Sequence, residues 1–438
     1  AYEGLKLTNF YTAYPICSPS RASLLTGRVP IRTGVYSNTT YPEDLVLRVF
    51  LPQSTGGLSQ KEITIAKLLK TKGYQSKLIG KWHLGHYNYS LPTEVGGFDS
   101  FYGLPYSQDE GCPPGYGNPC SWWQKDVLRV PVPLYEDTKI IQQPVDLDTL
   151  MDRYNDQATS FIKSSVASKK PFFLYYAYDE VHVPLFASKQ WKNKSKRGLF
   201  GDATMEMDAS IGMIMDLLKD LKVDDNTFVF FSSDNGPWLD QKQDGGSAGP
   251  FKGGKGSTYE GGLREPAIAW WPGKIKPMSV SSTPTTTMDL LPTWCELAGV
   301  TLPTDRVYDG HSITTTLFGT QELPSRPLVF YRGKNVYAIR IGSYKAHFFT
   351  RSGFGVDAPV AHNPPLLYNL DNDPGEAYPL EGTEYDEIIS MIQKAKTEHE
   401  KSVKVVPPEL DAMSGAEDVE PCCYGTIFPA CTCNVPLY

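Results

Sequence analysis

Three strand-like runs, each followed directly by polar residues, constrain the fold of this chain more than any other feature. The runs cover residues 75–80, 172–177 and 227–231. The second and third are continuous aromatic and aliphatic stretches, which is typical of strands buried on both faces. Helix-like segments separate the runs, and strands that alternate with helices predict a largely parallel sheet covered on both sides.

Two of the intervening segments have helical periodicity. The first, residues 59–73, opens with a capping box formed by Ser59 and Glu62 and stops at Gly73. The second runs from about residue 202 to 221 and carries one apolar stripe, which we interpret as core rather than as a ligand surface. The members of the stripe are Met207, Ile211, Ile214, Met215 and Leu218.

The sequence changes in character past Pro324. Short strand-like stretches, separated by tight polar turns, cover residues 328–331, 336–340 and 345–349, and a helix-like stretch covers residues 384–401. This pattern predicts a smaller antiparallel α+β domain. We therefore expect an α/β protein with two domains. Residues 1–325 would form a large mixed, mostly parallel sheet flanked by helices, and residues 326–438 an antiparallel-sheet domain with a cysteine-rich tail.

Composition narrows the classes of partner. The 438 residues carry a net charge of -7, which gives no reason to expect a nucleic acid, because nucleic-acid binding usually demands a basic face. No apolar stretch is long enough to span a bilayer. An acidic protein that binds an anion must concentrate lysine, arginine or a metal at the site. The opening residues 1–4 do not resemble a signal peptide and suggest that an N-terminal region has been removed.

The cysteines and glycosylation sequons favour an oxidising compartment. Cys112 and Cys120 bracket a Pro/Gly loop, and four of the eight cysteines crowd the tail. Pairs that close loops and tails indicate disulfides. A zinc site is the less favoured alternative, since the tail has adjacent cysteines and no nearby histidine. N-x-S/T sequons at Asn38, Asn88 and Asn193 also indicate a secreted or lysosomal glycoprotein. The tail cysteines are Cys422, Cys423, Cys431 and Cys433.

Residues that can carry chemistry follow each of the three strand-like runs. Lys81 and His83 follow the first run, His182 follows the second, and Asp234 and Asn235 follow the third. Taken singly, each is explained well enough as a loop or turn residue. In open α/β sheets, however, ligands bind beyond the carboxyl ends of the strands. We therefore expect these five side chains along one edge of one sheet.

A fourth element, residues 15–27, places Cys17 at the start of a predicted helix. Ser18 can cap this helix, Pro19 fits its first position and Gly27 fits its end. Free N–H groups and the helix dipole favour an anion at such a place. The alternative is a small buried thiol at a helix start. The motif Cys-x-Pro-Ser-Arg arises by chance in roughly one chain in a thousand of this size, which weakens that alternative.

Residues 15–27 and 73–84 resemble the two signatures of the sulfatase family, and the likeness extends over nearly the whole chain, closest to the arylsulfatases. Supporting segments are residues 104–109, 254–262 and 345–350. The resemblance implies an alkaline-phosphatase-like fold. It also implies hydrolysis of a sulfate ester, namely an aryl sulfate, a sulfated sugar or a sulfated glycolipid.

The resemblance implies that Cys17 is oxidised to formylglycine. The formylglycine-generating enzyme reads Cys-x-Pro-x-Arg, which is present here with Pro19 and Arg21. The hydrated aldehyde supplies two hydroxyls on one carbon. One attacks sulfur and displaces the alcohol, and the other then loses a proton and expels sulfate, so that covalent catalysis proceeds in two steps.

Further roles carry over to positions that match the family's motifs. Lys81 and Lys255 would bind sulfate oxygens and stabilise the charge of the transition state, and Ser107 matches a serine that contacts sulfate. His83 would take the proton from the second hydroxyl. His182, together with Lys255, would protonate the leaving alcohol, and Arg21 would hold the hydrated aldehyde. We interpret His347 as packing at a domain interface. The expected catalytic residues are Cys17, Arg21, Lys81, His83, His182 and Lys255, and the expected substrate-binding residues are Lys81, Ser107, His182 and Lys255.

The resemblance also implies a divalent cation, Ca²⁺ or Mg²⁺, held partly by Asp234, Asn235 and the modified Cys17. The cation would polarise a sulfate oxygen and lower the pKa of the nucleophilic hydroxyl. Family members carry two adjacent aspartates upstream of the segment that matches residues 5–11, and this chain starts after them. We therefore expect a fragment without its first central strand rather than a degenerate homologue, because the downstream residues persist together.

Two other functions stay open. A phosphate or phosphonate ester hydrolase of the same superfamily would suit the same metal and lysines, and a comparison of aryl sulfate with aryl phosphate turnover separates it. A non-catalytic extracellular glycoprotein would bind sulfated polysaccharide without turnover. The expected partners are the sulfate ester, the formylglycine-generating enzyme and, as an option, a second copy of the chain in a homo-oligomer.

Overall fold

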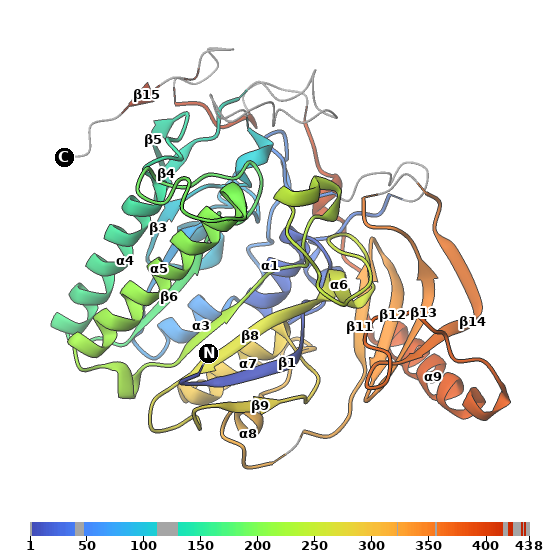
Figure 1. Ribbon diagram of the computed structural model, residues 1–438. Coiled ribbons are helices and arrows are strands. Elements are labelled where there is room, and N and C mark those ends of the chain that lie inside the picture. The colour runs from blue at the N-terminus through green and yellow to red at the C-terminus, as the bar shows by residue number, and fades with distance from the viewer. Residues whose placement is uncertain are drawn as a thin grey trace. The chain divides into compact units, whose positions relative to one another are not determined.

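The computed structural model (Figure 1) describes residues 2–39, 48–111, 130–321, 323–354, 357–414, 419–423, 431 and 433–434. Contacts between residues divide the chain into two compact units. The first unit comprises Ala1–Val49, Asp225–Lys242 and Gly246–Asp411. The second unit comprises Phe50–Asp224, Gln243–Gly245 and Ala412–Tyr438.

A mixed five-stranded sheet forms the centre of the first unit. Its order is β10-β1-β8-β7, and β9 pairs with β1 outside that path. Strand β1 (Leu5–Tyr11) runs antiparallel to β8 (Arg264–Trp270) and parallel to β9 (Ser279–Ser281) and β10 (Thr285–Thr286). Strand β7 (Val229–Ser232) runs antiparallel to β8. The apolar side of this sheet is buried against the segments that carry α7 and α8, in a cluster that includes Phe10, Leu290 and Ile313.

Helix α1 (Cys17–Thr26) follows β1 and carries the cysteine motif. Gly27 ends the helix in the left-handed conformation, with φ of 68°, as predicted. The predicted start was wrong: Ile16 is the N-cap residue, Cys17 is the first helical residue, and Ser18 is the second. The backbone explains the earlier start, because the N–H of Ser20 donates to the Ile16 carbonyl oxygen and the missing N–H of Pro19 is not needed in a first turn. The other helices around this sheet are α2 (Pro30–Thr33), α6 (Glu260–Leu263), α7 (Leu290–Leu297) and α8 (Thr314–Leu317).

The first unit also contains a separate four-stranded antiparallel sheet in the order β11-β12-β13-β14. Three of its strands were predicted, as was the helix α9 (Asp386–Ser402) that packs on it. Strand β14 was not predicted, because it contains two adjacent prolines, which argue against a strand. It lies at the edge of the sheet, where a missing N–H is tolerated. The strands are β11 (Leu328–Arg332), β12 (Asn335–Ile341), β13 (Tyr344–Thr350) and β14 (Val360–Asn369).

The second unit is built on a six-stranded mixed sheet in the order β15-β5-β4-β3-β2-β6. The strands β3, β2 and β6 run parallel to one another, and the remaining neighbours are antiparallel. Their bounds are β2 (Gln75–Gly80), β3 (Ser100–Gly103), β4 (Leu134–Glu136), β5 (Lys139–Gln143), β6 (Phe172–Ala177) and β15 (Cys433–Asn434).

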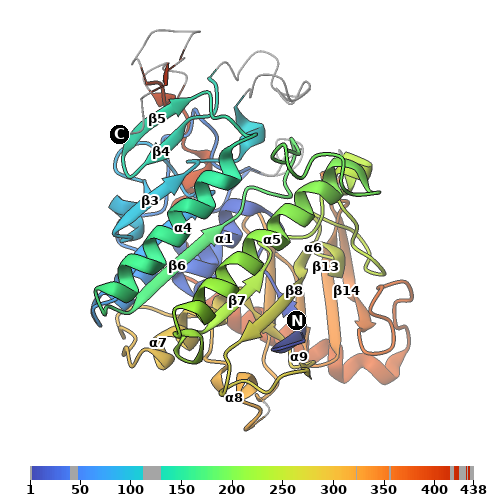
Figure 2. The same ribbon diagram turned by 60° about the vertical axis from the view of Figure 1, so that its left-hand side comes forward.

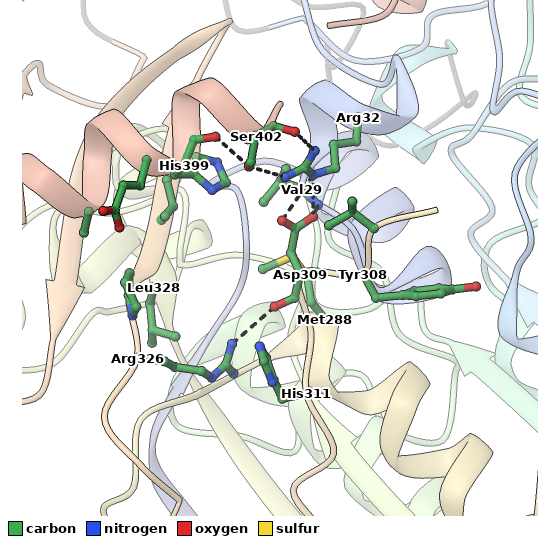
Figure 3. Close-up of a pocket in the computed structure, with 15 residues that line it drawn as sticks. Val29, Arg32, Met288, Tyr308, Asp309, His311, Arg326, Leu328, His399 and Ser402 are labelled. Atoms are coloured by element: carbon green, nitrogen blue, oxygen red, sulfur yellow. Dashed lines mark hydrogen bonds and ion pairs between the residues drawn. The ribbon is translucent and has the colours of Figure 1, made fainter. Parts of the chain in front are cut away.

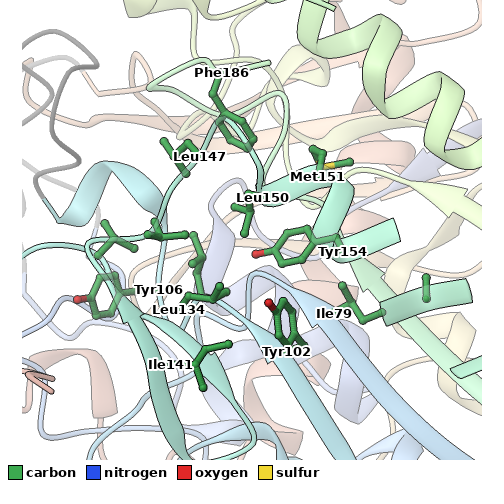
Figure 4. Packing of buried hydrophobic residues seen from close by; sticks show 14 residues of the cluster. Ile79, Tyr102, Tyr106, Leu134, Ile141, Leu147, Leu150, Met151, Tyr154 and Phe186 are labelled. Atoms are coloured by element: carbon green, nitrogen blue, oxygen red, sulfur yellow. The ribbon is translucent and has the colours of Figure 1, made fainter. Parts of the chain in front are cut away.

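Helices α4 (Leu150–Ala167) and α5 (Gly198–Asp220) contact each other in the second unit (Figure 2). A core of aliphatic and tyrosine side chains joins α4 to the sheet, with Ile79, Tyr102 and Tyr154 at its centre (Figure 4). The predicted helix 59–73 is shorter, since α3 covers only Ile65–Lys70. The Ser59 hydroxyl accepts the N–H of Lys61 in a local turn, and the hydroxyl of Thr64 caps the helix instead.

The fold class is confirmed, with mixed sheets flanked by helices and a separate small antiparallel sheet. The expectation of strands buried on both faces was wrong for β6 and β7. Each is the last strand of its sheet within the described residues, and its side chains are mostly only partly buried. The expectation of a single sheet was also wrong, because β7 pairs with β8 and not with β2 or β6. An apolar run predicts burial, but it does not say which strand will be the neighbour. Of the predicted stripe on α5, only Leu218 is fully buried.

Two disulfides close the tail, Cys422–Cys431 and Cys423–Cys433, which confirms the disulfide prediction there. Cys112 and Cys120 lie outside the described residues. The sequon residues Asn38, Asn88 and Asn193 are all exposed. Over the described ranges, no helix combines the length and the apolar character that a membrane crossing requires.

Candidate active site

Cys17 is buried at the first position of α1, with 3% of its surface exposed. The turn before it is fixed by main-chain hydrogen bonds: the N–H of Thr12 donates to Leu263 O at 2.8 Å, and the N–H of Gly256 donates to Pro15 O at 2.8 Å. The hydroxyls of Thr12 and Ser20 also share a hydrogen bond. The Cys17 side chain is therefore carried by a turn that is attached to the loop of Lys255.

Arg21 lies one helical turn after Cys17 and reaches the end of β7. Its Nε donates to Asp234 Oδ2 at 2.8 Å, with 8% of the arginine and 22% of the aspartate side chain exposed. A charge-assisted bond of this kind is stronger than a neutral one. The structure therefore joins the modification motif to the predicted metal ligand, which the sequence placed 213 residues apart.

Asn235 has the properties of a metal ligand. Its Nδ2 donates to Gly236 O at 3.0 Å, while its Oδ1 is buried and accepts no hydrogen bond within the described part of the chain. A buried acceptor without a donor costs free energy unless another electropositive partner is present. The amide oxygen and the neighbouring Asp234 carboxylate are hard oxygen donors, which Ca²⁺ and Mg²⁺ prefer. The two residues therefore fit a divalent cation.

Lys255 lies in a glycine-rich loop that folds tightly on itself. A Cβ on Gly261 or Gly262 would collide with a main-chain oxygen of the same loop, so side chains are excluded there. The N–H of Lys255 donates to Pro237 O at 2.8 Å. Its Nζ lies 4.6 Å from the centre of the Trp238 ring, and 6% of the residue is exposed.

Glu265 was not predicted from the sequence. It lies in β8 and is buried, with 6% exposed. Burial raises its pKa well above the ordinary value, and the charge of Asp234 raises it further. Nothing in the sequence distinguishes this glutamate from a strand residue, because its proximity to Asp234 depends on the pairing of β7 with β8.

In the second unit, Lys81 and His83 follow β2 directly, as predicted. The N–H of Lys81 donates to Ala177 O at 2.8 Å, which ties the ends of β2 and β6 together. His83 Nε2 lies 3.0 Å from Phe50 O and 3.0 Å from Glu110 Oε2. Both oxygens are acceptors, so Nε2 carries the hydrogen and Nδ1 is the basic nitrogen of the neutral ring. Glu110 was missed by the sequence analysis, although it comes directly after the segment 104–109.

His182 and Ser107 are brought together in the second unit. His182 Nδ1 lies 2.7 Å from Val183 O and 3.4 Å from Ser107 Oγ, with Asp109 Oδ1 at 3.7 Å. The Gln108 amide donates to His182 O at 2.9 Å and so holds the main chain of this turn. Three neighbours therefore fix the orientation of the imidazole ring.

The predicted residues thus form two groups, one in each unit. The group in the first unit consists of Cys17, Arg21, Asp234, Asn235 and Lys255, and the group in the second unit consists of Lys81, His83, Ser107 and His182. His347 belongs to neither group: it is fully buried and its Nε2 lies 2.6 Å from Glu376 Oε1, which agrees with a packing role.

The first unit also contains a cavity of about 300 Å³ that none of these residues lines (Figure 3). Arg32 and Arg326 line it together with His311 and His399. Arg32 is paired with Asp309, and Arg326 is paired with Asp289. Both positive charges are therefore neutralised, and the cavity shares no residue with the predicted site.

Comparison with known proteins supports the resemblance. The family model described as Sulfatase matches residues 1–300, and the one described as C-terminal region of aryl-sulfatase matches residues 323–433. N-acetylgalactosamine-6-sulfatase of Homo sapiens is 40% identical over 450 residues, which cover 95% of this chain and 82% of that protein. Arylsulfatase A of Homo sapiens is 38% identical over 469 residues, covering 100% of this chain and 89% of that protein. The crystal structure of the PsFucS1 sulfatase from Pseudoalteromonas sp. superposes with a TM-score of 0.80 at 29% identity, covering 93% of this chain and 85% of that one.

Proposed function

Because the chain belongs to the sulfatase family, it is a sulfuric ester hydrolase, and we propose that Cys17 is the residue from which its nucleophile is made. The observation that carries the proposal is the position of Cys17 at the first residue of α1, with Arg21 one turn later in contact with Asp234. Sulfatases use formylglycine, which supplies a hydrated aldehyde with two hydroxyls when it has formed. Pro19 and Arg21 provide the sequence that the formylglycine-generating enzyme reads.

The family uses a divalent cation, and we assign Asp234 and Asn235 to it. The support is the buried Oδ1 of Asn235, which accepts no hydrogen bond from the described residues, and the carboxylate next to it. When bound, the cation supplies a Lewis acid that polarises a sulfate oxygen. Ca²⁺ takes about six to eight oxygen ligands, so the two residues would hold only part of its shell. Arg21 holds the Asp234 carboxylate through Oδ2.

Lys255, Lys81 and Ser107 are proposed to bind the sulfate group. Both lysines are almost completely buried, with 6% and 2% exposed, so their charges act in a medium of low dielectric. Cationic donors that are already in place stabilise the charge that develops on sulfate oxygens without the cost of reorganisation. The residues of the first unit and those of the second unit are assigned to one reaction because both match motifs of the sulfatase family. The assignment uses no distance between the two units.

Two histidines are proposed to move protons. The Nε2 atom of His83 carries the hydrogen, because it faces the acceptors Phe50 O and Glu110 Oε2. The Nδ1 atom is therefore the basic nitrogen and is suited to take a proton. His182, oriented by Val183 O and Ser107, is suited to protonate the leaving alcohol. The carboxylates Glu110 and Asp109 would stabilise the protonated forms of these rings.

Substrate and location are further parts of the proposal. The relatives are named for N-acetylgalactosamine 6-sulfate and for aryl sulfates, and we propose a sulfated sugar or an aryl sulfate for this chain. Two disulfides in the tail and three exposed sequon asparagines support a secreted or lysosomal glycoprotein. The division into a catalytic domain up to residue 325 and a C-terminal domain also stays a prediction.

The test joins modification to turnover. Co-expression with the formylglycine-generating enzyme should convert the Cys17 peptide to the aldehyde, detected by mass spectrometry, and the protein should hydrolyse an aryl sulfate in preference to an aryl phosphate. Cys17→Ala should abolish turnover, whereas Cys295→Ala, a change at another buried cysteine, should leave it intact. An unmodified thiol in an active enzyme, or a preference for the phosphate ester, would refute the proposal.

A further inference from the structure

The Lys255 ammonium group lies over two aromatic rings in cation–π contacts. Its Nζ is 4.6 Å from the centre of the Trp238 ring and 5.9 Å from the centre of the Phe354 ring. The rings are 5.0 Å apart and tilted by 34°. The Trp238 and Phe354 side chains are partly exposed to solvent. Lys255, in contrast, is buried, with 6% of its surface exposed. The family assignment of Lys255 gives no role to either ring.

The second ring, Phe354, comes from the connection between β13 and β14, and Arg332 holds the main chain next to it. Arg332 is 3% exposed, and its Nη1 donates to Gly256 O at 2.7 Å, next to Lys255. The same Nη1 donates to Gly353 O at 2.9 Å, next to Phe354. One buried guanidinium group thus ties the lysine loop to the segment that follows β13, and it fixes Phe354 against Trp238.

An ester bound through this lysine must place its organic part close to the rings. The alcohol carbon of a sulfate ester is only two bonds from sulfur, so an ester that binds Lys255 through sulfate oxygens extends over a surface within a few ångströms of Nζ. Ligand sites of this kind are mostly apolar, with a few polar groups that fix orientation. A partly exposed aromatic pair provides such a surface, because aromatic faces bury a large area and attract the positively polarised C–H bonds of a ring.

We propose that Trp238 and Phe354 form the wall that binds the ring of the leaving alcohol, and that this ring is a sulfated hexose. This inference rests on the proposed role of Lys255 and goes beyond it, because it assigns specificity to residues outside the sulfatase motifs. The chair form of a hexose presents a face of C–H bonds to an aromatic wall while its hydroxyls remain in water. The two rings, 5.0 Å apart and tilted by 34°, pack against each other and so form one continuous surface rather than a slot.

The experiment separates binding of the ring from binding of the anion. In the Trp238→Ala and Phe354→Ala variants, the KM for N-acetylgalactosamine 6-sulfate should rise about tenfold, which corresponds to about 1.4 kcal/mol. The inhibition constant of inorganic sulfate should stay unchanged, and kcat should change less than KM. Trp238→Phe should recover most of the affinity. Trp191→Ala, at another partly exposed tryptophan, is the matched control and should match the wild type.

Three results would overturn the inference. An unchanged KM shows that the rings do not touch the substrate. A parallel rise in the inhibition constant of sulfate shows that they only hold Lys255. A rise confined to 4-nitrophenyl sulfate shows that the wall binds aryl groups. The same affinities can be measured by calorimetry in the Cys17→Ala protein. An enzyme that binds the sulfated hexose but hydrolyses no sulfate ester would therefore refute the proposed function and leave the inference intact.

Discussion

A buried pair of glutamates in the second unit predicts a stability that falls as pH rises. Glu180 follows β6 and is 6% exposed, and Glu206 lies in α5 and is 3% exposed. Glu206 Oε2 accepts the N–H of Ser188 at 2.7 Å. Burial, followed by the negative charge of Glu206, raises the pKa of Glu180 from 4.5 to about 10. Glu180 is therefore neutral in the folded protein at pH 7.

The sign of the effect follows from proton linkage. Below pH 4.5 the Glu180 carboxyl is protonated in both the folded and the unfolded chain, and it costs nothing. Between pH 4.5 and about 10 only the folded protein keeps the proton, so the free energy of unfolding falls with rising pH. The slope is about 1.4 kcal/mol per pH unit. At pH 7 the loss approaches about 3 kcal/mol.

The Glu180→Gln variant removes this dependence, because the amide has nearly the same shape and stays neutral. The variant and the wild type should have similar thermal midpoints at pH 4.5. At pH 7 the variant should unfold roughly 3 °C above the wild type, because the unfolding entropy of a chain of this length divides a difference of about 3 kcal/mol. Differential scanning fluorimetry at closely spaced pH values measures this gap. Asp216→Asn, at an exposed position of α5, is the control and should show a gap that does not change with pH.

The reasoning is refuted if the Glu180→Gln and wild-type midpoints run parallel between pH 4.5 and 8. That result would mean that Glu180 is charged in the folded protein despite its burial. A variant that is less stable at every pH would show instead that the carboxyl makes contacts that an amide does not replace.

Two further predictions concern buried polar groups in the first unit. Asn235→Ala removes the buried amide oxygen and should weaken Ca²⁺ or Mg²⁺ binding at least about tenfold in a calorimetric titration. Asn235→Asp keeps an oxygen donor and should retain binding. An Asn235→Ala variant with the metal affinity of the wild type would contradict the assignment. Glu376 is fully buried against Lys345 and His347, at 3.2 and 2.6 Å, and although burial alone would raise its pKa, these charges lower it to about 2. Glu376→Gln should therefore lower the free energy of unfolding by about 3 kcal/mol at pH 7. The difference in thermal midpoint between the variant and the wild type should shrink as pH falls from 4.5 toward 2. A difference that does not change with pH would show that the charge of Glu376 is not the cause.

Local signals in the sequence predicted the elements that depend on local chemistry. Gly27 ends α1 because a left-handed residue closes the helix, and the motif around Cys17 was recognised because its residues are contiguous. The prediction of a capping box at Ser59 and Glu62 was wrong, because the Ser59 hydroxyl accepts the N–H of Lys61 in a turn. The helix begins later, after its N-cap residue Thr64. Two competing uses of one serine have the same sequence pattern.

The site residues that the sequence did not predict were missed for a different reason. Glu265 acquires its place beside Asp234 through strand pairing, and Phe354 meets Trp238 across 116 residues of chain. Neither contact has a period or a motif in the sequence. Glu110 is the exception, since it follows a segment that was already recognised, and its distance of 3.0 Å to His83 Nε2 gives it a role. The sequence could therefore suggest the site residues themselves, whereas their side-chain partners could be identified only from the structure.

Residues of the small antiparallel sheet and of the segment that follows it hold the Lys255 loop in place through hydrogen bonds. Arg332 donates to Gly256 O at 2.7 Å, and Gly256 in turn donates to Pro15 O at 2.8 Å, two residues before Cys17. At the far end of the loop, Glu376 Oε2 accepts the N–H of Glu260 at 2.6 Å. One such bond is worth only about 1 kcal/mol, but these are buried and they hold both ends of one short loop. The position of the lysine therefore depends on residues more than seventy positions away along the chain. These bonds give a physical reason why the two regions matched by the family models, residues 1–300 and 323–433, occur together in this chain.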